Sequence, residues 1–153
     1  MLKQRKGFTL IEILIVIGLI AVLAGVLIVA LNPARQFSQA RNAQRWNNMD
    51  TIISSIIANT TDNKGVFTCA AGAIPTTAAD MTSTSGANNY NIGPCLVPTF
   101  AASLTVDPSV AGAHWTSPTD YDSGYTVVRD ATSGRITVAA PGAELSETIS
   151  MTR

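Results

Sequence analysis

One carboxylate interrupts a long apolar segment near the start of this chain. From Phe8 to Leu31 there are 24 residues, and Glu12 is the only one of them that ionises. As a helix the segment extends about 36 Å, which is enough to cross a bilayer with some tilt. A charged side chain in such a segment costs about 2.5–3.5 kcal/mol even on a lenient insertion scale. A simple membrane anchor gains nothing from that cost, so we expect Glu12 to have a partner.

An amine is the best candidate for this partner. If the chain is cut between Gly7 and Phe8, the new α-amino group lies four residues before Glu12, on the first turns of the same helix. A cationic amine of a neighbouring copy then pairs with Glu12 when the helices pack side by side, because an opposite charge favours the ionised carboxylate.

This arrangement resembles the class III signal of type IV pilins and pseudopilins. A short basic leader, residues 1–7, precedes Phe8-Thr9-Leu10-Ile11-Glu12 and an unbroken apolar stretch. The resemblance implies that a membrane peptidase, the prepilin peptidase, cleaves after Gly7 and methylates the new N-terminal Phe8. It also implies that Glu12 docks subunits into a filament. The resemblance covers roughly the first 31 residues closely and the rest only in layout.

Two other interpretations of this segment stay open. In the first, Glu12 snorkels from a simple signal anchor and docks nothing. In the second, the segment is an ordinary secretory signal peptide, for which Val22-Leu23-Ala24 fits a small-residue cleavage site. Against the second, the apolar run continues through residues 25–31, so cleavage there would release a protein with an apolar N-terminus.

Charge is divided unevenly along the 153 residues. The chain has ten basic and ten acidic residues, and three of the basic ones lie in the leader, which leaves a net charge of −3 from Phe8 onward. Residues 32–64 carry a net +2 and residues 65–153 a net −4. The leader's cations stay in the cytoplasm, so everything after Leu31 lies outside. Because an acidic head disfavours DNA, we expect the basic residues of the helix to face acidic surfaces of neighbouring subunits: Arg35, Arg41 and Arg45.

Two cysteines, Cys69 and Cys95, fall in the exported part of the chain. Outside the cytosol a pair with this spacing favours a disulfide, which would contribute about 3 kcal/mol in the loop-entropy model. Two free thiols are the alternative. With the single distant His114 they form no metal-binding pattern.

The periodicity predicts one long helix from Phe8 to about Thr60, kinked at Asn32-Pro33. In its first half, Gly18, Ala21 and Gly25 form a stripe of small residues that lets helices approach closely in lipid. Its second half is amphipathic, with an apolar face available to cover a sheet. That face consists of Phe37, Ala40, Met49, Ile52, Ile53, Ile56 and Ile57.

The C-terminal third has a β pattern. Residues 125–129 and 135–139 are β-rich runs joined by a glycine-containing connection typical of a hairpin. Residues 100–106 predict another short strand or helix. Residues 68–100 predict an irregular surface connection. Asn59-Thr60-Thr61 formally fits a glycosylation sequon, a pattern that is common by chance.

The sequence predicts no catalytic residue, no metal and no cofactor. His114 is the only histidine, and its neighbours favour a loop or packing role. A phosphate-binding glycine loop is also missing. The carboxylates of Asp107, Asp120, Asp122 and Asp130 suit Ca²⁺, but their spacing fits no known calcium loop, which favours solvated turn aspartates.

Together these patterns predict an α+β protein in which a long N-terminal helix packs on a small antiparallel β-sheet head. We expect a leader (1–7), a transmembrane and filament-core helix (8–31), the amphipathic half of that helix (32–62) and a globular head (63–153).

The function that the resemblance implies is structural, not enzymatic. The chain would be a prepilin, held in the cytoplasmic membrane by a single span and then polymerised into an extracellular pilus. The implied partners are other copies, the prepilin peptidase, an assembly ATPase and an inner-membrane platform; nucleic acid is not expected. The alternatives are a pseudopilin of a type II secretion system and a monomeric, signal-anchored extracellular binding domain.

Overall fold

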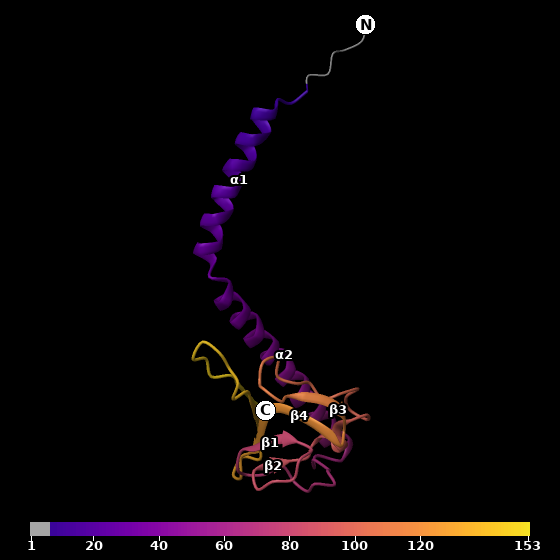
Figure 1. The fold of residues 1–153 in the computed structure, drawn as a ribbon. Helices are drawn as coiled ribbons and strands as arrows, with labels where there is room; N and C mark the ends of the chain where they lie inside the picture. The colour runs from indigo at the N-terminus through magenta and orange to yellow at the C-terminus, as the bar shows by residue number, and fades with distance from the viewer. Residues whose placement is uncertain (1–6) are drawn as a thin grey trace. The chain divides into compact units, whose positions relative to one another are not determined.

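The computed structural model describes residues 7–153, with the side chains of residues 29–31 left aside. Six of the seven residues predicted as a leader therefore lie outside the described residues. The chain divides into two compact units, Met1–Phe37 and Ser38–Arg153, which we treat separately (Figure 1). We call the second unit the head.

Helix α1, Leu10–Leu31, makes up most of the first unit. It ends because Asn32 takes a left-handed conformation, with φ of 41°, and the ring of Pro33 excludes Asn32 from helical geometry. The Asn32 side chain then accepts a hydrogen bond from the Arg35 amide at 3.4 Å, and helix α2, Pro33–Asp62, begins with proline at its first position. The single long helix predicted from the sequence is thus two helices.

Helix α2 contributes one face to the core of the head. Its buried residues recur at spacings of three and four, as predicted, and comprise Asn42, Arg45, Met49, Ile52, Ile53, Ser55, Ile56 and Asn59. Phe37 and Ile57, assigned to this face from the sequence, are exposed. Gly65 follows the helix with φ of 90°, and its amide donates to the Thr60 carbonyl at 2.8 Å, the left-handed ending expected there.

One small mixed sheet and the connections around it supply the rest of the core. The strand order of the sheet is β2-β1-β4-β5-β6, with β3 also paired to β4. Only β1 and β2 are parallel. The strands are β1 Ala79–Thr82, β2 Asn89–Tyr90, β3 His114–Ser117, β4 Asp120–Arg129, β5 Ile136–Ala139 and β6 Ser150–Thr152. The α+β class is confirmed.

The predicted hairpin is formed by β4 and β5. Val127 lies opposite Val138 in an antiparallel register, and both side chains are buried. In the connecting turn the Asp130 carboxylate accepts hydrogen bonds from the amides of Thr132 and Ser133, and Gly134 adopts a φ of 71°. The turn is therefore fixed by local chemistry that the sequence displays.

Two predictions about the middle of the head are wrong. Residues 100–106 form neither strand nor helix, because α2 satisfies their polar groups: Asn48 donates to the Val106 carbonyl at 2.9 Å and accepts from the Thr105 hydroxyl at 3.2 Å. Residues 68–100 are not wholly irregular, since they contain β1, β2 and the short helix α3, Gly93–Leu96.

Candidate functional site

The residues around the predicted cleavage point precede α1 and are exposed. Gly7, Phe8 and Thr9 lie outside the helix, and 79% of Phe8 is exposed. Thr9 caps the helix, because its hydroxyl accepts a hydrogen bond from the Glu12 amide at 3.3 Å. Thr9 and Glu12 have the spacing of a capping box, a signal that our reading of the sequence missed. The Glu12 carboxylate itself bonds to nothing within residues 7–153, so it is available to another molecule.

The side chains of α1 that the structure describes are not covered by other described residues. Every residue from Leu10 to Ile28 is exposed, and this stretch is the one helix in the described part that is long and apolar enough to cross a membrane. Burying one Leu or Ile side chain is worth about 1.5–3 kcal/mol. Lipid or other protein chains must therefore cover α1.

The glycines in the stripe of small residues on α1 pack against nothing within residues 7–153. A Cβ atom added at Gly18 or Gly25 meets nothing within 4 Å. If the small side chains of Gly18, Ala21 and Gly25 allow close packing, the molecule that packs against them is not part of residues 7–153.

Residues 2–28 match the prokaryotic N-terminal methylation motif. This segment is the class III signal of type IV pilins and pseudopilins. The motif indicates a pilin-like or pseudopilin precursor that is anchored in a membrane and processed by a prepilin peptidase. No curated protein and no solved structure matches the chain.

Downstream of the methylation motif, the predicted disulfide joins Cys69 to Cys95. The side chain of Asn59 in α2 hydrogen-bonds to the backbone near both cysteines. Its amide nitrogen donates to the carbonyls of Thr68 and Cys95 at 3.1 and 3.0 Å, and its amide oxygen accepts from the Thr68 amide at 2.9 Å. Asn59 is only 3% exposed. The glycosylation sequon at Asn59 is therefore inaccessible in the folded head.

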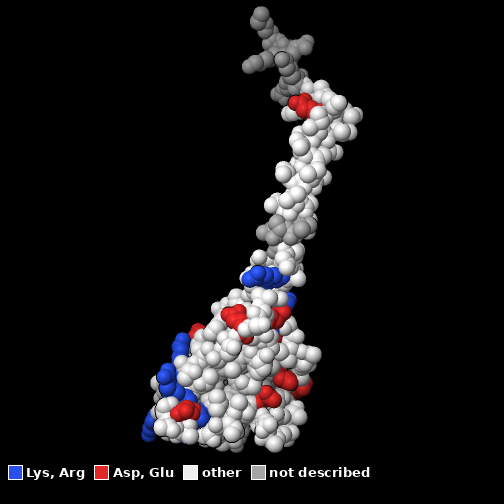
Figure 2. Space-filling view, turned by 90° about the vertical axis from the view of Figure 1, so that its left-hand side faces the viewer, with Lys and Arg blue, Asp and Glu red and all other residues white. Residues whose placement is uncertain are grey.

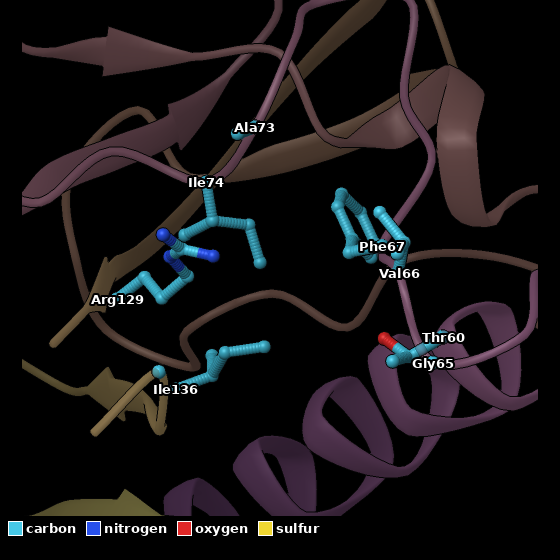
Figure 3. Close-up of a pocket in the computed structure, with 9 residues that line it drawn as sticks. Thr60, Gly65, Val66, Phe67, Ala73, Ile74, Arg129 and Ile136 are labelled. Atoms are coloured by element: carbon cyan, nitrogen blue, oxygen red, sulfur yellow. The ribbon is translucent and has the colours of Figure 1, made fainter. Parts of the chain in front are cut away.

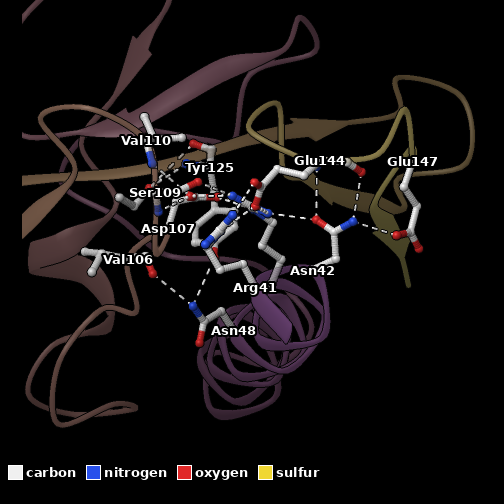
Figure 4. A network of polar contacts seen from close by, with 12 residues as sticks. Arg41, Asn42, Asn48, Val106, Asp107, Ser109, Val110, Tyr125, Glu144 and Glu147 are labelled. Atoms are coloured by element: carbon white, nitrogen blue, oxygen red, sulfur yellow. Dashed lines mark hydrogen bonds and ion pairs between the residues drawn. The ribbon is translucent and has the colours of Figure 1, made fainter. Parts of the chain in front are cut away.

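A buried ion pair lies at the opposite end of α2's head portion (Figure 4). The Arg45 guanidinium donates to both carboxylate oxygens of Asp107, at 2.7 and 3.0 Å, and both side chains are completely buried. Burial alone would raise the pKa of Asp107, but Arg45 and the amides of Ser109 and Val110 outweigh it, so the pKa lies below its usual value. A buried charge without such partners would be strongly unfavourable.

Around this pair, α2 holds the loop between β5 and β6, residues 140–149. The Arg41 guanidinium donates to both oxygens of Glu144 at 2.6 Å, and Arg45 donates to the same carboxylate at 3.1 Å. Hydrogen bonding from Arg41 is the main reason that the pKa of Glu144 falls to about 2. Asn42 adds bonds to the Glu144 backbone and to the Glu147 carboxylate. We call these contacts the loop clamp.

The prediction that Arg41 and Arg45 face neighbouring subunits is wrong, because their guanidinium groups bind carboxylates of the same chain. Arg45 and the amides of Ser109 and Val110 occupy the Asp107 carboxylate, so Asp107 is not available to a calcium site. Asp130 is engaged in its hairpin turn, and Asp120 lies 3.3 Å from His114 in an exposed pair. No cluster of three metal-ligating side chains occurs within residues 7–153.

A pocket of about 170 Å³ opens where α2 ends (Figure 3). Its walls are mostly apolar, and Arg129 is the only charged residue among those that line it: Thr60, Gly65, Val66, Phe67, Ala73, Ile74, Arg129, Gly134 and Ile136. Figure 3 shows the Arg129 guanidinium beside Ile74, across the pocket from Phe67. This pocket was not predictable from the sequence, because its walls come from three separate segments of the chain.

Proposed function

We propose that this chain is the precursor of a structural subunit of a type IV pilus-like filament. The observation that carries the proposal is the methylation motif over residues 2–28, on a helix whose apolar side chains have no partners in their own chain. The membrane covers α1 before assembly, and the α1 helices of other copies cover it in the filament.

Processing separates the precursor from the mature subunit. The leader, residues 1–7, keeps its cations in the cytoplasm until the peptidase cuts between Gly7 and Phe8 and methylates Phe8. Residues 8–31 then form the filament core, residues 32–62 the amphipathic helix and residues 63–153 the globular part of the head that follows this helix.

Cleavage also creates the partner that Glu12 requires. In the precursor the nitrogen of Phe8 belongs to a neutral amide, whereas in the mature chain it is a cationic amine. Glu12 of one copy pairs with the Phe8 amine of its neighbour, which offsets the cost of a carboxylate in an apolar environment. Assembly is thereby biased toward processed subunits.

The stripe of Gly18, Ala21 and Gly25 lets neighbouring α1 helices approach closely where no water is present to drive association. An assembly ATPase and a membrane platform extract subunits from the membrane into the growing filament. The finished pilus lies outside the cell.

Glu12 provides the test. Glu12→Gln keeps the shape and removes the charge, and Glu12→Leu removes both the charge and the hydrogen bonding. Both variants should insert and be cleaved normally, while the yield of sheared surface filaments falls, more for Leu than for Gln. Ile13→Leu, on the same turn, is the matched control and should assemble like wild type. Normal filaments from Glu12→Leu, in cells that contain no wild-type subunit, would contradict the docking role.

A further inference from the structure

The pocket at the end of α2 contains a cation without a partner. The Arg129 guanidinium forms neither an ion pair nor a hydrogen bond with residues 7–153, although Arg41, Arg45 and Arg153 are all paired. Lys64 and Arg135, next in sequence to pocket residues, are equally unpaired within the described chain. Asp130 also lies at this end, but its carboxylate is held by its own turn. The pocket therefore offers apolar walls and one available positive charge.

On the face that Figure 2 displays, basic side chains gather along one edge of the head, while acidic side chains form mostly separate groups. This basic edge presents a largely positive surface to a neighbour.

The loop held by the clamp has complementary features. Leu145 is 49% exposed, and Glu147 is exposed beside it with only a neutral amide, that of Asn42, on its carboxylate. The loop projects from the sheet as the yellow segment of Figure 1. It thus presents an apolar side chain next to a negative charge.

The backbone of this loop is held in an unfavourable conformation. Leu145 and Ser146 have φ values of 59° and 57°, and this left-handed conformation is unfavourable for residues with a side chain. Glu144 on one side and Glu147 on the other are anchored to α2, so the clamp offsets this cost. A rigid apolar tip loses little conformational freedom when it binds a partner.

The loop and the pocket lie at opposite ends of the same helix. Asn42 anchors the loop and Thr60 lines the pocket, and this separation of 18 residues along α2 corresponds to about 27 Å. A loop cannot reach the pocket of its own head. A contact between two different surfaces of identical copies does not close into a dimer of twofold symmetry, and it continues from copy to copy.

We infer that the head carries a head-to-tail docking site for a second copy of this chain. Leu145 of one copy inserts among Phe67, Ile74 and Ile136 of the next, and the Glu147 carboxylate pairs with Arg129. This inference rests on the proposed function, to which it adds a second longitudinal contact outside the filament core.

Disulfide trapping between full-length chains tests the contact. Val66→Cys places a thiol on the pocket rim and Ser146→Cys places one on the loop, and both positions are exposed. Cells that express the two variants together should give linked dimers, and a chain carrying both substitutions should give a ladder of multimers. Either variant alone should give about a tenth of that product or less, since a disulfide requires Cα atoms within about 7 Å. Thr119→Cys combined with Ser146→Cys is the control pair and should not link.

Exchanging the charges tests the chemistry of the contact. Arg129→Glu or Glu147→Arg alone should lower the ladder about tenfold, and the two together in one chain should restore it. Asp120→Arg, an exposed acidic position away from the loop, should change nothing. Equal loss in the doubly exchanged chain and in the single variants would overturn the pairing.

The outcomes separate this inference from the proposed function. Filaments that form without any Val66–Ser146 linkage would overturn the head contact and leave the pilus proposal standing. Linked heads in membranes of cells that make no filaments would support the contact and contradict the pilus proposal. If Arg129→Glu abolished retention of duplex DNA by filaments but left the ladder unchanged, the pocket would be a nucleic-acid contact and the inference would be wrong.

Discussion

Arg45 is a fully buried cation whose guanidinium donates to four side chains, those of Asp107, Asn42, Glu144 and Ser109. A buried pair of this kind contributes little net stability compared with a well-packed apolar pair, but the loss of one partner leaves an uncompensated charge. Arg45 and Asp107 can therefore be replaced only together, because either one alone would be a buried charge without a counter-ion.

We expect Arg45→Met to lower the free energy of unfolding by about 3–5 kcal/mol, because the Asp107 carboxylate loses its counter-ion inside the head. Urea denaturation of the full chain in detergent measures this. Arg153→Met breaks the exposed pair with Asp50 and should cost about 1 kcal/mol or less. Equal losses in the two variants would show that Arg45 is not effectively buried.

Acid should weaken the loop clamp. The pKa of Glu144 lies at about 2 in the folded head and near 4.5 in the absence of its partners. The stability from this carboxylate is fully present above about pH 4.5 and is lost as the pH falls through 2, because the unfolded chain takes up the proton first. The urea midpoint of the wild-type protein should fall from pH 5 to pH 2. The midpoint of Glu144→Gln should fall less steeply over the same range. Parallel curves would exclude Glu144 as the cause.

At the scale of elements, the strand β4 joins the halves of the sheet, since it pairs with β1, β3 and β5. The hairpin of β4 and β5 was predictable because alternating β-branched residues and a turn with Asp130 and Gly134 are local signals. Strand β1 was not, because four residues carry too little periodicity and its pairing with β4 spans about forty residues of chain. The Arg45–Asp107 pair escaped prediction for the same reason.

The disulfide should act on one segment more than on the whole head. Replacing both Cys69 and Cys95 by serine removes a constraint on a loop of 26 residues, worth about 3 kcal/mol in the loop-entropy model. We expect amide hydrogen exchange to accelerate most in residues 70–94 and least around Val127 and Val138, which lie in the core of the hairpin. Uniform acceleration across the head would contradict this expectation.

At the scale of the whole molecule, the motif around Gly7, Phe8 and Glu12 was readable from the sequence because it depends on linear spacing. The α+β class followed from changes of periodicity along the chain. The pocket and the loop clamp depend on side chains brought together from distant segments, and single-sequence patterns do not encode such proximity. The sequence indicated a kink at Asn32-Pro33. That the helix ends there completely follows from the left-handed backbone conformation of Asn32.

Gly7 should matter for processing and not for folding. A Cβ atom at Gly7 meets nothing within 4 Å, so Gly7→Val should leave the head intact while the side chain obstructs the peptidase. Full-length precursor should then accumulate in the membrane, whereas wild-type protein should begin at methylated Phe8 by N-terminal sequencing and mass spectrometry. Thr9→Ser, which keeps the helix cap, is the control. A wild-type N-terminus at Gly25 would instead identify an ordinary signal peptide.

The loop clamp also affects the order in which parts of the chain can fold during synthesis. It joins side chains that are 99 to 105 residues apart in sequence, and a ribosome needs about 5–20 s to synthesise such a length. Throughout that interval Glu144 and Glu147, the partners of Arg41 and Asn42, do not yet exist, and the strands that cover the apolar face of α2 are still being made. Contacts between such distant residues form late. The apolar segment of α1 is therefore synthesised long before the loop between β5 and β6 can be fixed against α2.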